Sequence, residues 1–269
     1  MRKLLLLLIL AIANTALAQE EEWDVYLASY NGKPGSTVIN MGLKKTAPLV
    51  SFPYVLVTGV RYTNCREDGF PEEGELDRLY VISDSLDATL ERVFTIKKAG
   101  TFTNNCERLE YYYPSDTMGV RGKLLQLYSS VFGAYDPYIN IKADREWTYY
   151  LEFLYPNETI REYMSNQKVL DALLKAGDKL EAARKVDHWV YFKTTKDLDC
   201  FQAAIKQMGF EIEGTGKDKK SPMPFRLQFS RNDKVDLSSI SAITADLRKK
   251  AANCLGDYDG WETFVIKDQ

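Results

Sequence analysis

The stretch "KVDHWVYFKTTKDLDCFQAAIKQMGFEI", Lys185 to Ile212, decides the fold of the second half of the chain. Its first part, "VDHWVYF", is made of β-branched and aromatic residues that favour a strand. The next part places apolar residues at helical spacing, and "GF" opens another strand after a glycine. The stretch therefore predicts a strand, a helix and a second strand in close succession.

Working outward from this stretch, the second half shows the order β-α-β-β-α-β, the pattern of a ferredoxin-like sandwich. In that fold two helices cover one face of a four-stranded antiparallel sheet. The predicted elements are strands at 186–193, 210–214, 225–231 and 261–267 and helices at 198–208 and 237–255.

The first half predicts an antiparallel sheet with two helices. A hairpin is expected around "NGKPG", because this is turn chemistry between two strand-like runs. The other predicted elements are strands at 54–62, within "GTFTNNCERLEYYYP" up to Pro114, and at 146–156, and helices in "ELDRLYVISDSLDATLERV" and "GKLLQLYSSVF".

The fold class is therefore α+β with two domains. We expect an N-terminal α+β domain at 19–160, a connecting helix and linker at 161–184, and the ferredoxin-like domain at 185–269. The connecting helix is predicted to break at Gly177.

The first 18 residues, "MRKLLLLLILAIANTALA", have the pattern of a secretory signal peptide: two basic residues, a short apolar run and a small-x-small cleavage site. The mature chain would begin near Gln19. No later run is apolar enough for a membrane helix, so we expect a soluble exported protein, periplasmic or secreted, without a membrane anchor.

Charge is divided unevenly along the chain. Residues 19–165 contain 15 basic and 22 acidic residues, whereas residues 166–269 contain 18 and 16. A nucleic-acid binder usually carries a basic stripe. In the second half, the run "KDKK" at 217–220 is typical of a solvated loop, so no nucleic-acid partner is predicted.

Four cysteines in an exported chain suggest disulfides. The simplest of the three possible connectivities pairs Cys65 with Cys106 in the first half and Cys200 with Cys254 in the second. The absence of Cys-x-x-Cys and the presence of one histidine argue against a zinc site or a redox motif. No cofactor is predicted.

The single histidine, His188, decides whether "VDHWVYF" is a catalytic or a structural motif. On a strand it shares a face with Val186, Val190 and Phe192, whereas Asp187 and Trp189 point to the opposite face. A general base oriented by a carboxylate is one interpretation. We favour the other, a half-buried histidine hydrogen-bonded to a neighbour.

Other possible site residues have a simpler explanation. Glu72, Glu73 and Glu75 could act as paired carboxylates, but acidic residues at a helix start also complement the helix dipole. The tyrosine-rich runs could line a binding face, although strand propensity explains them too. No catalytic residue is predicted, and Asp187, His188 and Trp189 remain candidate interaction residues.

The segment "GDKLEAARKVDHWVYF" followed by a helix and "GF" resembles the family of regulator of ribonuclease E activity B. The N-terminal half resembles the domain-of-unknown-function 695 family through "WDVYLASYNGKPGSTVIN", "DGFP" and "CERLEYYY". The first resemblance implies a ferredoxin-like C-terminal domain and, for the family, binding and inhibition of a cytoplasmic RNA-degrading enzyme.

We therefore expect a non-catalytic binding or regulatory module that acts through an unidentified protein partner. Two alternatives stay open. The protein is an inhibitor of a ribonuclease if it stays in the cytoplasm, or it is a hydrolase of an unrecognised class with His188 or the acidic cluster in its site.

Overall fold

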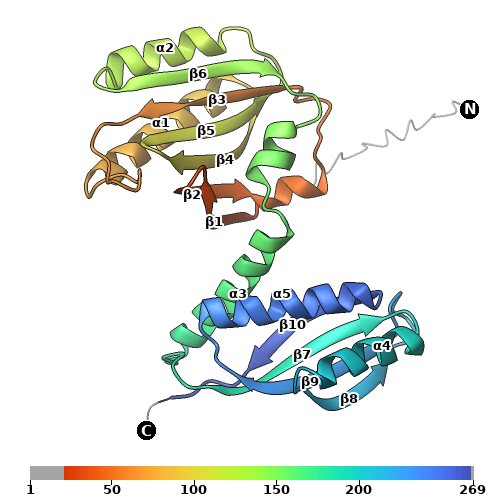
Figure 1. Ribbon diagram of the computed structural model, residues 1–269. Helices are drawn as coiled ribbons and strands as arrows, with labels where there is room; N and C mark the ends of the chain where they lie inside the picture. Colours follow the sequence, from red (N-terminus) through yellow and green to blue (C-terminus); the bar gives the residue numbers. More distant parts are fainter. Residues whose placement is uncertain (1–20, 268–269) are drawn as a thin grey trace, which may run out of the picture. The chain divides into compact units, whose positions relative to one another are not determined.

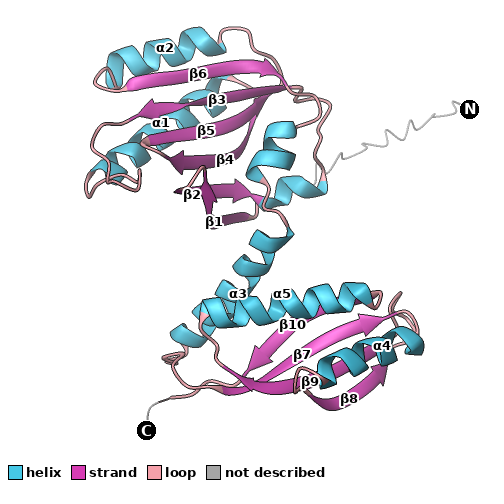
Figure 2. Ribbon diagram, viewed as in Figure 1, coloured by secondary structure: helices cyan, strands magenta, loops and turns pink. Residues whose placement is uncertain are grey.

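The computed structural model describes residues 21–267, and the predicted signal peptide lies outside this part. The chain divides into two compact units, one ending at Tyr155 and the other beginning at Pro156, each with its own antiparallel sheet (Figures 1 and 2). The two units are described separately below.

The N-terminal unit is built on a six-stranded sheet with the order β1-β2-β4-β5-β3-β6. Helices α1 and α2 pack on one face and bury an apolar core between themselves and β3 and β5. The elements are β1 (Trp23–Tyr30), β2 (Lys33–Asn40), η1 (Met41–Lys45), β3 (Tyr54–Arg61), α1 (Glu75–Val93), β4 (Ile96–Asn104), β5 (Glu107–Pro114), α2 (Val120–Val131), β6 (Asp136–Ala143) and η2 (Tyr149–Leu154).

The predicted hairpin and the two helices are confirmed, but the "GTFTNNCERLEYYYP" prediction is wrong. This segment forms two strands, β4 and β5, joined by a tight turn at Asn105 and Cys106. Both turn residues have positive φ, 49° and 63°. Asparagine tolerates this backbone conformation, so "NN" before the cysteine was the turn signal.

The predicted strand at 146–156 is also wrong, because Tyr149–Leu154 forms a π-helix. The buried residues Trp147, Tyr150 and Leu154 are spaced by three and four, which is helical spacing. The Asp144 carboxylate starts the turn by accepting the backbone N–H groups of Thr148 and Tyr149 at 2.9 and 3.1 Å. The high strand propensity of aromatic residues explains this wrong prediction. Strand β6 was not predicted.

The C-terminal unit has the predicted β-α-β-β-α-β order, and its sheet order is β10-β7-β9-β8. Helices α4 and α5 lie on one face of this sheet (Figure 2). The elements are α3 (Glu158–Lys175), β7 (Arg184–Phe192), α4 (Thr195–Lys206), β8 (Glu211–Lys217), β9 (Phe225–Asp233), α5 (Leu237–Asn253) and β10 (Gly256–Thr263).

Strand β10 begins at Gly256, earlier than the predicted start at Trp261. It pairs antiparallel with β7, so that Gly256 lies opposite Phe192. A Cβ atom at Gly256 would sit 2.3 Å from the Phe192 ring, so any other residue here would force the buried ring to move. This close approach cannot be read from the local sequence.

Helix α3 packs against α5 within the C-terminal unit. The fully enclosed amide of Asn166 connects them: it donates to the Thr244 hydroxyl at 2.9 Å and accepts from the Trp261 indole N–H at 2.8 Å. A disulfide between Cys200 and Cys254 joins α4 to the end of α5. The two helices that cover the sheet are therefore fixed to each other and to α3.

Candidate functional site

Strand β7 has one buried face and one face that keeps contact with solvent. We call the buried face, which α4 and α5 cover, the sealed face. We call the solvent-contacting face the open face. The sealed face comprises Arg184, Val186, His188, Val190 and Phe192, and the open face comprises Lys185, Asp187, Trp189 and Tyr191.

His188 lies on the sealed face with 0% of its surface exposed. Its Nδ1 atom is 2.8 Å from the Tyr258 hydroxyl, and its ring stacks on Phe229 with centroids 5.3 Å apart. Its Nε2 atom is the one buried side-chain polar atom without a hydrogen-bond partner among the described residues. Burial, together with the nearby Arg231 charge, lowers the pKa of His188 from 6.5 to about 3.

This environment suits a neutral structural histidine. Its neighbour is a tyrosine and not a carboxylate, because Asp187 points to the other side of the sheet. A general base must reach the proton it removes, and His188 has no surface through which a substrate could do so. The histidine is more deeply buried than the half-buried position that the sequence suggested.

The open face places Trp189 at its centre, half-buried. Across the ladders, Trp189 lies opposite Gly260 of β10 and Gln228 of β9, and Gln228 in turn pairs with Gly214 of β8. Side chains are missing at both glycines, and a Cβ atom at either would meet nothing within 4 Å. The Trp189 side chain therefore has free space on its β10 side, next to Gly260, and Gln228 as its neighbour on the β9 side.

The open face carries charges of both signs, and it includes the exposed side chains of Arg226, opposite Tyr191, and Glu211, opposite Ser230. On the β8 side, Lys185 pairs with Glu213 at 2.8 Å. On β10, Asp257 and Glu262 lie on the open face, opposite Tyr191 and Asp187, and Asp259 is the bulge residue between them. These three carboxylates are exposed and form no ion pair with any residue in 21–267. They are called the β10 acidic strip below.

Asp178 and Arg184, from the segment "GDKLEAARKVDHWVYF", form a buried ion pair on the sealed side, called the clamp below. The Arg184 guanidinium binds the Asp178 carboxylate through two nitrogen atoms, and both side chains are 1% exposed. Asp178 also accepts the N–H of Ile266 at 2.7 Å, and Arg184 donates to the carbonyl of Phe264 at 3.1 Å. The hydrogen bond from Arg184 lowers the pKa of Asp178 well below its usual range. The clamp ties the loop after α3 to the segment after β10.

The N-terminal unit has its own buried polar cluster under α1. The Glu110 carboxylate accepts from the hydroxyls of Ser83 and Thr101 at 2.5 Å and lies 3.1 Å from the Lys98 ammonium. Lys98 also pairs with Asp87 at 2.6 Å. The hydroxyls and the lysine occupy the oxygens of Glu110, which makes this cluster a satisfied structural network.

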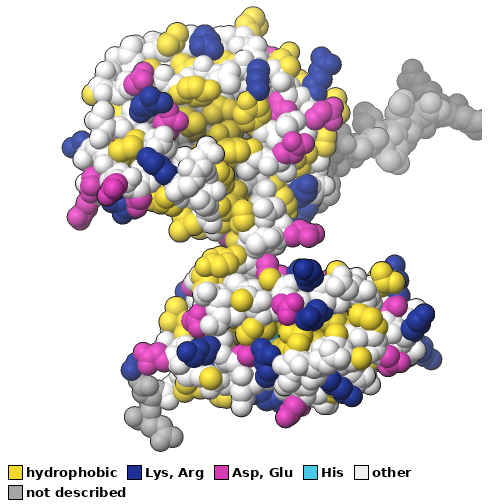
Figure 3. Space-filling model, viewed as in Figure 1, with side chains coloured by type: hydrophobic (Ala, Val, Ile, Leu, Met, Phe, Trp, Pro, Cys, Tyr) yellow, Lys and Arg dark blue, Asp and Glu magenta, His cyan; other side chains and the backbone are white. Residues whose placement is uncertain are grey.

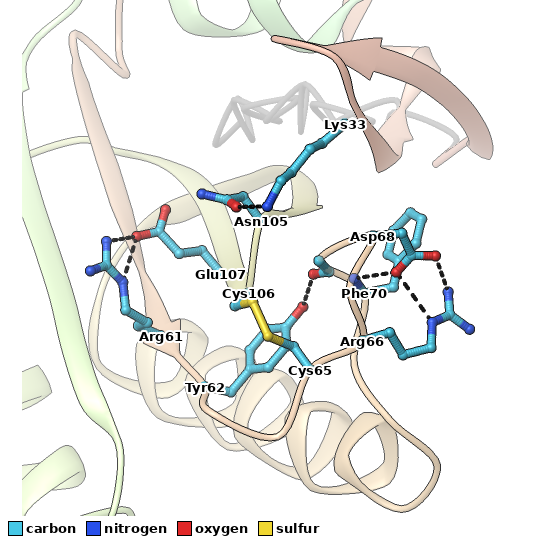
Figure 4. Close-up of a disulfide and its surroundings, with 11 residues drawn as sticks. Lys33, Arg61, Tyr62, Cys65, Arg66, Asp68, Phe70, Asn105, Cys106 and Glu107 are labelled. Carbon is cyan, nitrogen blue, oxygen red and sulfur yellow. Dashed lines mark hydrogen bonds and ion pairs between the residues drawn. A yellow bond between two sulfur atoms is a disulfide. The ribbon is translucent and has the colours of Figure 1, made fainter.

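The "DGFP" and "CER" motifs of this unit meet at the disulfide between Cys65 and Cys106 (Figure 4). The Tyr62 hydroxyl donates to the Gly69 carbonyl at 3.0 Å, and that carbonyl also accepts the Cys106 N–H at 2.8 Å. Gly69 has φ of 88°, and a Cβ atom there would sit 2.7 Å from the backbone of Asn105. These motifs therefore build a tight loop.

The acidic cluster before α1 does not form a pair of facing carboxylates. Glu72 and Glu73 are exposed, whereas Glu75 is 3% exposed and accepts from the Tyr135 hydroxyl at 3.0 Å. Within residues 21–267 no group of three His, Cys, Asp or Glu side chains is arranged to hold a metal ion. None of the helices in this part is long and apolar enough to cross a membrane.

The N-terminal sheet has an apolar surface on the face that α1 does not cover. Figure 3 shows hydrophobic side chains gathered there. The rings of Tyr30, Phe102, Phe153 and Tyr111 contact one another in a row. Tyr111 is only 4% exposed, and the Tyr112 and Tyr113 rings are fully buried. Most of the tyrosine-rich sequence therefore serves the core.

Comparison with known families identifies both units. The chain belongs to the family of unknown function DUF695, whose model matches residues 21–155. Residues 164–263 match the family "Regulator of ribonuclease activity B", so both resemblances are confirmed. No curated protein matches the chain.

Among solved structures, the chain is similar to one titled "Partial Cas6-RT-Cas1--Cas2 complex" and one titled "Cas6-RT-Cas1--Cas2 complex". Both show 13% identity and a TM-score of 0.21 over 82% of this chain, which spans 48% and 30% of those chains. A similarity at this level carries no argument about fold or function.

Sequence reasoning singled out Asp187, His188 and Trp189 together, but the structure separates them. His188 lies inside, and the other two lie on the open face. The β10 acidic strip was not predicted, because residues 257–259 lie between the predicted helix at 237–255 and the predicted strand at 261–267. The alternation of polar and apolar residues in "GDYDGWET" was the signal that could have found it.

Proposed function

We propose that the protein is an exported, non-catalytic regulatory module that binds a protein partner through the open face of β7. The observation that carries this proposal is the difference in exposure between neighbouring residues of β7. His188, the chain's single histidine, is buried in the core, whereas Trp189 and Tyr191 are half-exposed. Tryptophan and tyrosine are enriched at binding hot spots, since they combine large apolar area with few rotamers. The regulator family of the C-terminal unit supports a binding role over a catalytic one.

Export is supported by the two disulfides, one in each unit. Disulfides form and persist in oxidising compartments. The signal-type sequence at residues 1–18 agrees with this. A partner in the periplasm or outside the cell is therefore favoured over a cytoplasmic one.

The proposal is tested by purifying the tagged mature chain from the extracytoplasmic fraction of its native cells. We expect a partner protein to co-purify in stoichiometric amount with the wild type and to be lost with Trp189→Ala. The matched control is Trp23→Ala, which removes a 39% exposed tryptophan from the N-terminal unit. Loss with Trp23→Ala and not with Trp189→Ala would place the binding surface elsewhere.

A catalytic function makes the opposite prediction. A broad screen for hydrolase activity on the folded, oxidised chain is expected to show no turnover that depends on His188. Turnover that His188→Phe removes while the circular dichroism spectrum stays unchanged would refute a binding-only role.

Inhibition of a ribonuclease is a second candidate function, which the family of residues 164–263 favours. It requires the chain to stay in the cytoplasm. An intact mass measured with and without reduction decides this: a mature, fully oxidised chain excludes it, and a full-length, reduced chain revives it.

A further inference from the structure

We propose that the open face of the C-terminal unit binds a lysine- or arginine-rich segment of the partner, with Trp189 and the β10 acidic strip as the contact residues. This inference rests on the proposed function and specifies the chemistry of the partner. Its basis is the charge of the surface around one aromatic side chain.

The first step is the position of the charges. Asp257 lies across from Tyr191 and Glu262 across from Asp187, so carboxylates flank Trp189 on the β10 side. Residues directly opposite or diagonal on neighbouring strands are within reach of long side chains. A cation placed over the indole could therefore reach a carboxylate at either diagonal position on β10.

The second step is that these carboxylates have no partner within the unit. Asp187 contacts Gln228 at 3.3 Å and lies 3.8 Å from Lys185, but Asp257, Asp259 and Glu262 form no ion pair within residues 21–267. Some acidic groups of the same unit are paired, as Glu162 is with Arg248 at 2.5 Å, whereas the exposed Asp199 and Glu211 also form no ion pair within residues 21–267.

The strip is also opposite in sign to its surroundings in sequence. Residues 166–269 carry 18 basic and 16 acidic residues, so an acidic surface is not a consequence of their overall composition. Three exposed carboxylates lie on one strand, β10, beside the one tryptophan of the open face. Electrostatic complementarity of this kind steers association and selects a cationic partner.

The third step is the access to the indole ring. Gly260 leaves open space on the β10 side of Trp189, whereas Gln228 lies on the β9 side. The face of a tryptophan ring attracts lysine and arginine groups by cation–π interaction. The aliphatic part of a lysine or arginine side chain would lie over Gly260, and its charged group would reach the carboxylates of β10. A neutral or acidic segment would gain neither interaction.

The probe is a fluorescein-labelled ten-residue peptide in which arginine and glycine alternate, with a glutamate–glycine peptide of the same length for comparison. Binding to the full mature chain is measured by fluorescence anisotropy at physiological salt. Cation–π and hot-spot contacts predict that Trp189→Ala weakens binding of the arginine peptide by about fivefold or more. The glutamate peptide is expected not to bind.

The acidic N-terminal unit could attract a cationic peptide without any specific site, so a charge-matched control is needed. Asp257→Asn with Glu262→Gln removes two charges from the strip, and Asp84→Asn with Glu91→Gln removes two from the exposed surface of α1. We expect the first pair to weaken binding about fivefold or more and the second less than about twofold. Equal effects of the two pairs, or no effect of Trp189→Ala, would overturn the proposal.

The outcome is separable from that of the proposed function. If Trp189→Ala abolishes capture of the native partner but leaves peptide binding unchanged, the open face is a binding site and its preference for a cationic segment is refuted. If the partner is captured equally well by Trp189→Ala, the proposed function itself fails at this face.

Discussion

On the sealed face of β7 the side chains of Val186, His188 and Val190 have no exposed surface, whereas on the open face Trp189 and Tyr191 keep contact with solvent. The sealed face is held by two helices, a disulfide between them and a buried ion pair. None of the described helices of the C-terminal unit covers the open face, and one of its edges carries carboxylates that form no ion pair within residues 21–267. Neighbouring residues of one motif thus have different roles.

This difference shows why a motif should be divided by face before a function is assigned to it. The signature "RxVDHWxYF" contains Arg184 and His188, which are buried, and Asp187 and Trp189, which lie on the face that we propose binds a partner. The predictions below change one face at a time, so that stability and binding respond separately.

The largest expected effect is on the sealed face, at the buried clamp. Arg184→Ala leaves the Asp178 carboxylate buried without its cation, which should cost about 3–5 kcal/mol of unfolding free energy. Urea denaturation of wild type and variant measures this. Lys185→Ala, one residue along on the open face, should cost less than about 1 kcal/mol. Equal costs for the two variants would contradict the contrast between the faces.

The next largest effect concerns the helices that cover the sealed face. Cys200→Ala with Cys254→Ala opens a link over a sequence separation of 54 residues. The chain-entropy argument predicts a loss of about 2–4 kcal/mol, measured by thermal unfolding of the oxidised proteins. At a temperature where the variant is still folded, binding to the open face should be unchanged. A variant that keeps full stability would show that the disulfide does not hold these helices.

A pH dependence follows from His188, whose pKa is lowered from 6.5 to about 3 by burial. Above pH 6.5 the histidine is neutral in both the folded and the unfolded state. Below that value only the unfolded chain takes up the proton, so folding stability falls as the pH drops towards 3, by at most about 1.4 kcal/mol per pH unit.

The measurement is the unfolding free energy of wild type and His188→Phe between pH 7 and pH 4. Carboxylates contribute equally to both profiles, so the difference between the slopes isolates the histidine. We expect the variant to have the shallower profile. Parallel profiles would mean that His188 is protonated in the folded protein and is not sealed.

The smallest expected effect on stability is on the open face. Asp257→Asn with Glu262→Gln changes two exposed side chains and should alter the unfolding free energy by less than about 0.5 kcal/mol. The same variant is expected to lose affinity for the arginine peptide. A large loss of stability, seen in urea denaturation, would show that the β10 acidic strip has structural partners.

Much of the C-terminal fold could be predicted from the sequence, because each element has a local signal. Strand β7 and helix α4, which begins at Thr195 and was predicted from 198, follow from residue types and periodicity. In the N-terminal unit, the hairpin at Asn31 and Gly32 follows from its turn residues. The segment Tyr149–Leu154 could not be predicted in this way, because its aromatic residues suit a strand and only their contacts with the sheet make a helix better.

The candidate site was predictable only in part. Period-two alternation placed His188 and Trp189 on opposite faces but could not say which face the helices cover. Asp178 and Arg184 were part of a recognised sequence pattern. Their role in tying two segments together was not predictable, because it depends on hydrogen bonds to the backbone of Phe264 and Ile266, far along the chain. The β10 acidic strip required the register of β10 against β7, which is set by tertiary packing.

The most direct test of the open face as the functional surface is site-specific photo-crosslinking in living cells. A photoreactive phenylalanine at position 191 would report on the open face, and the same group at position 80, 48% exposed on α1, would report on a surface without an assigned role. We predict one recurrent protein crosslinked from position 191 and none from position 80. Crosslinks from position 80 alone, or from neither position while the partner still co-purifies, would contradict binding through the open face.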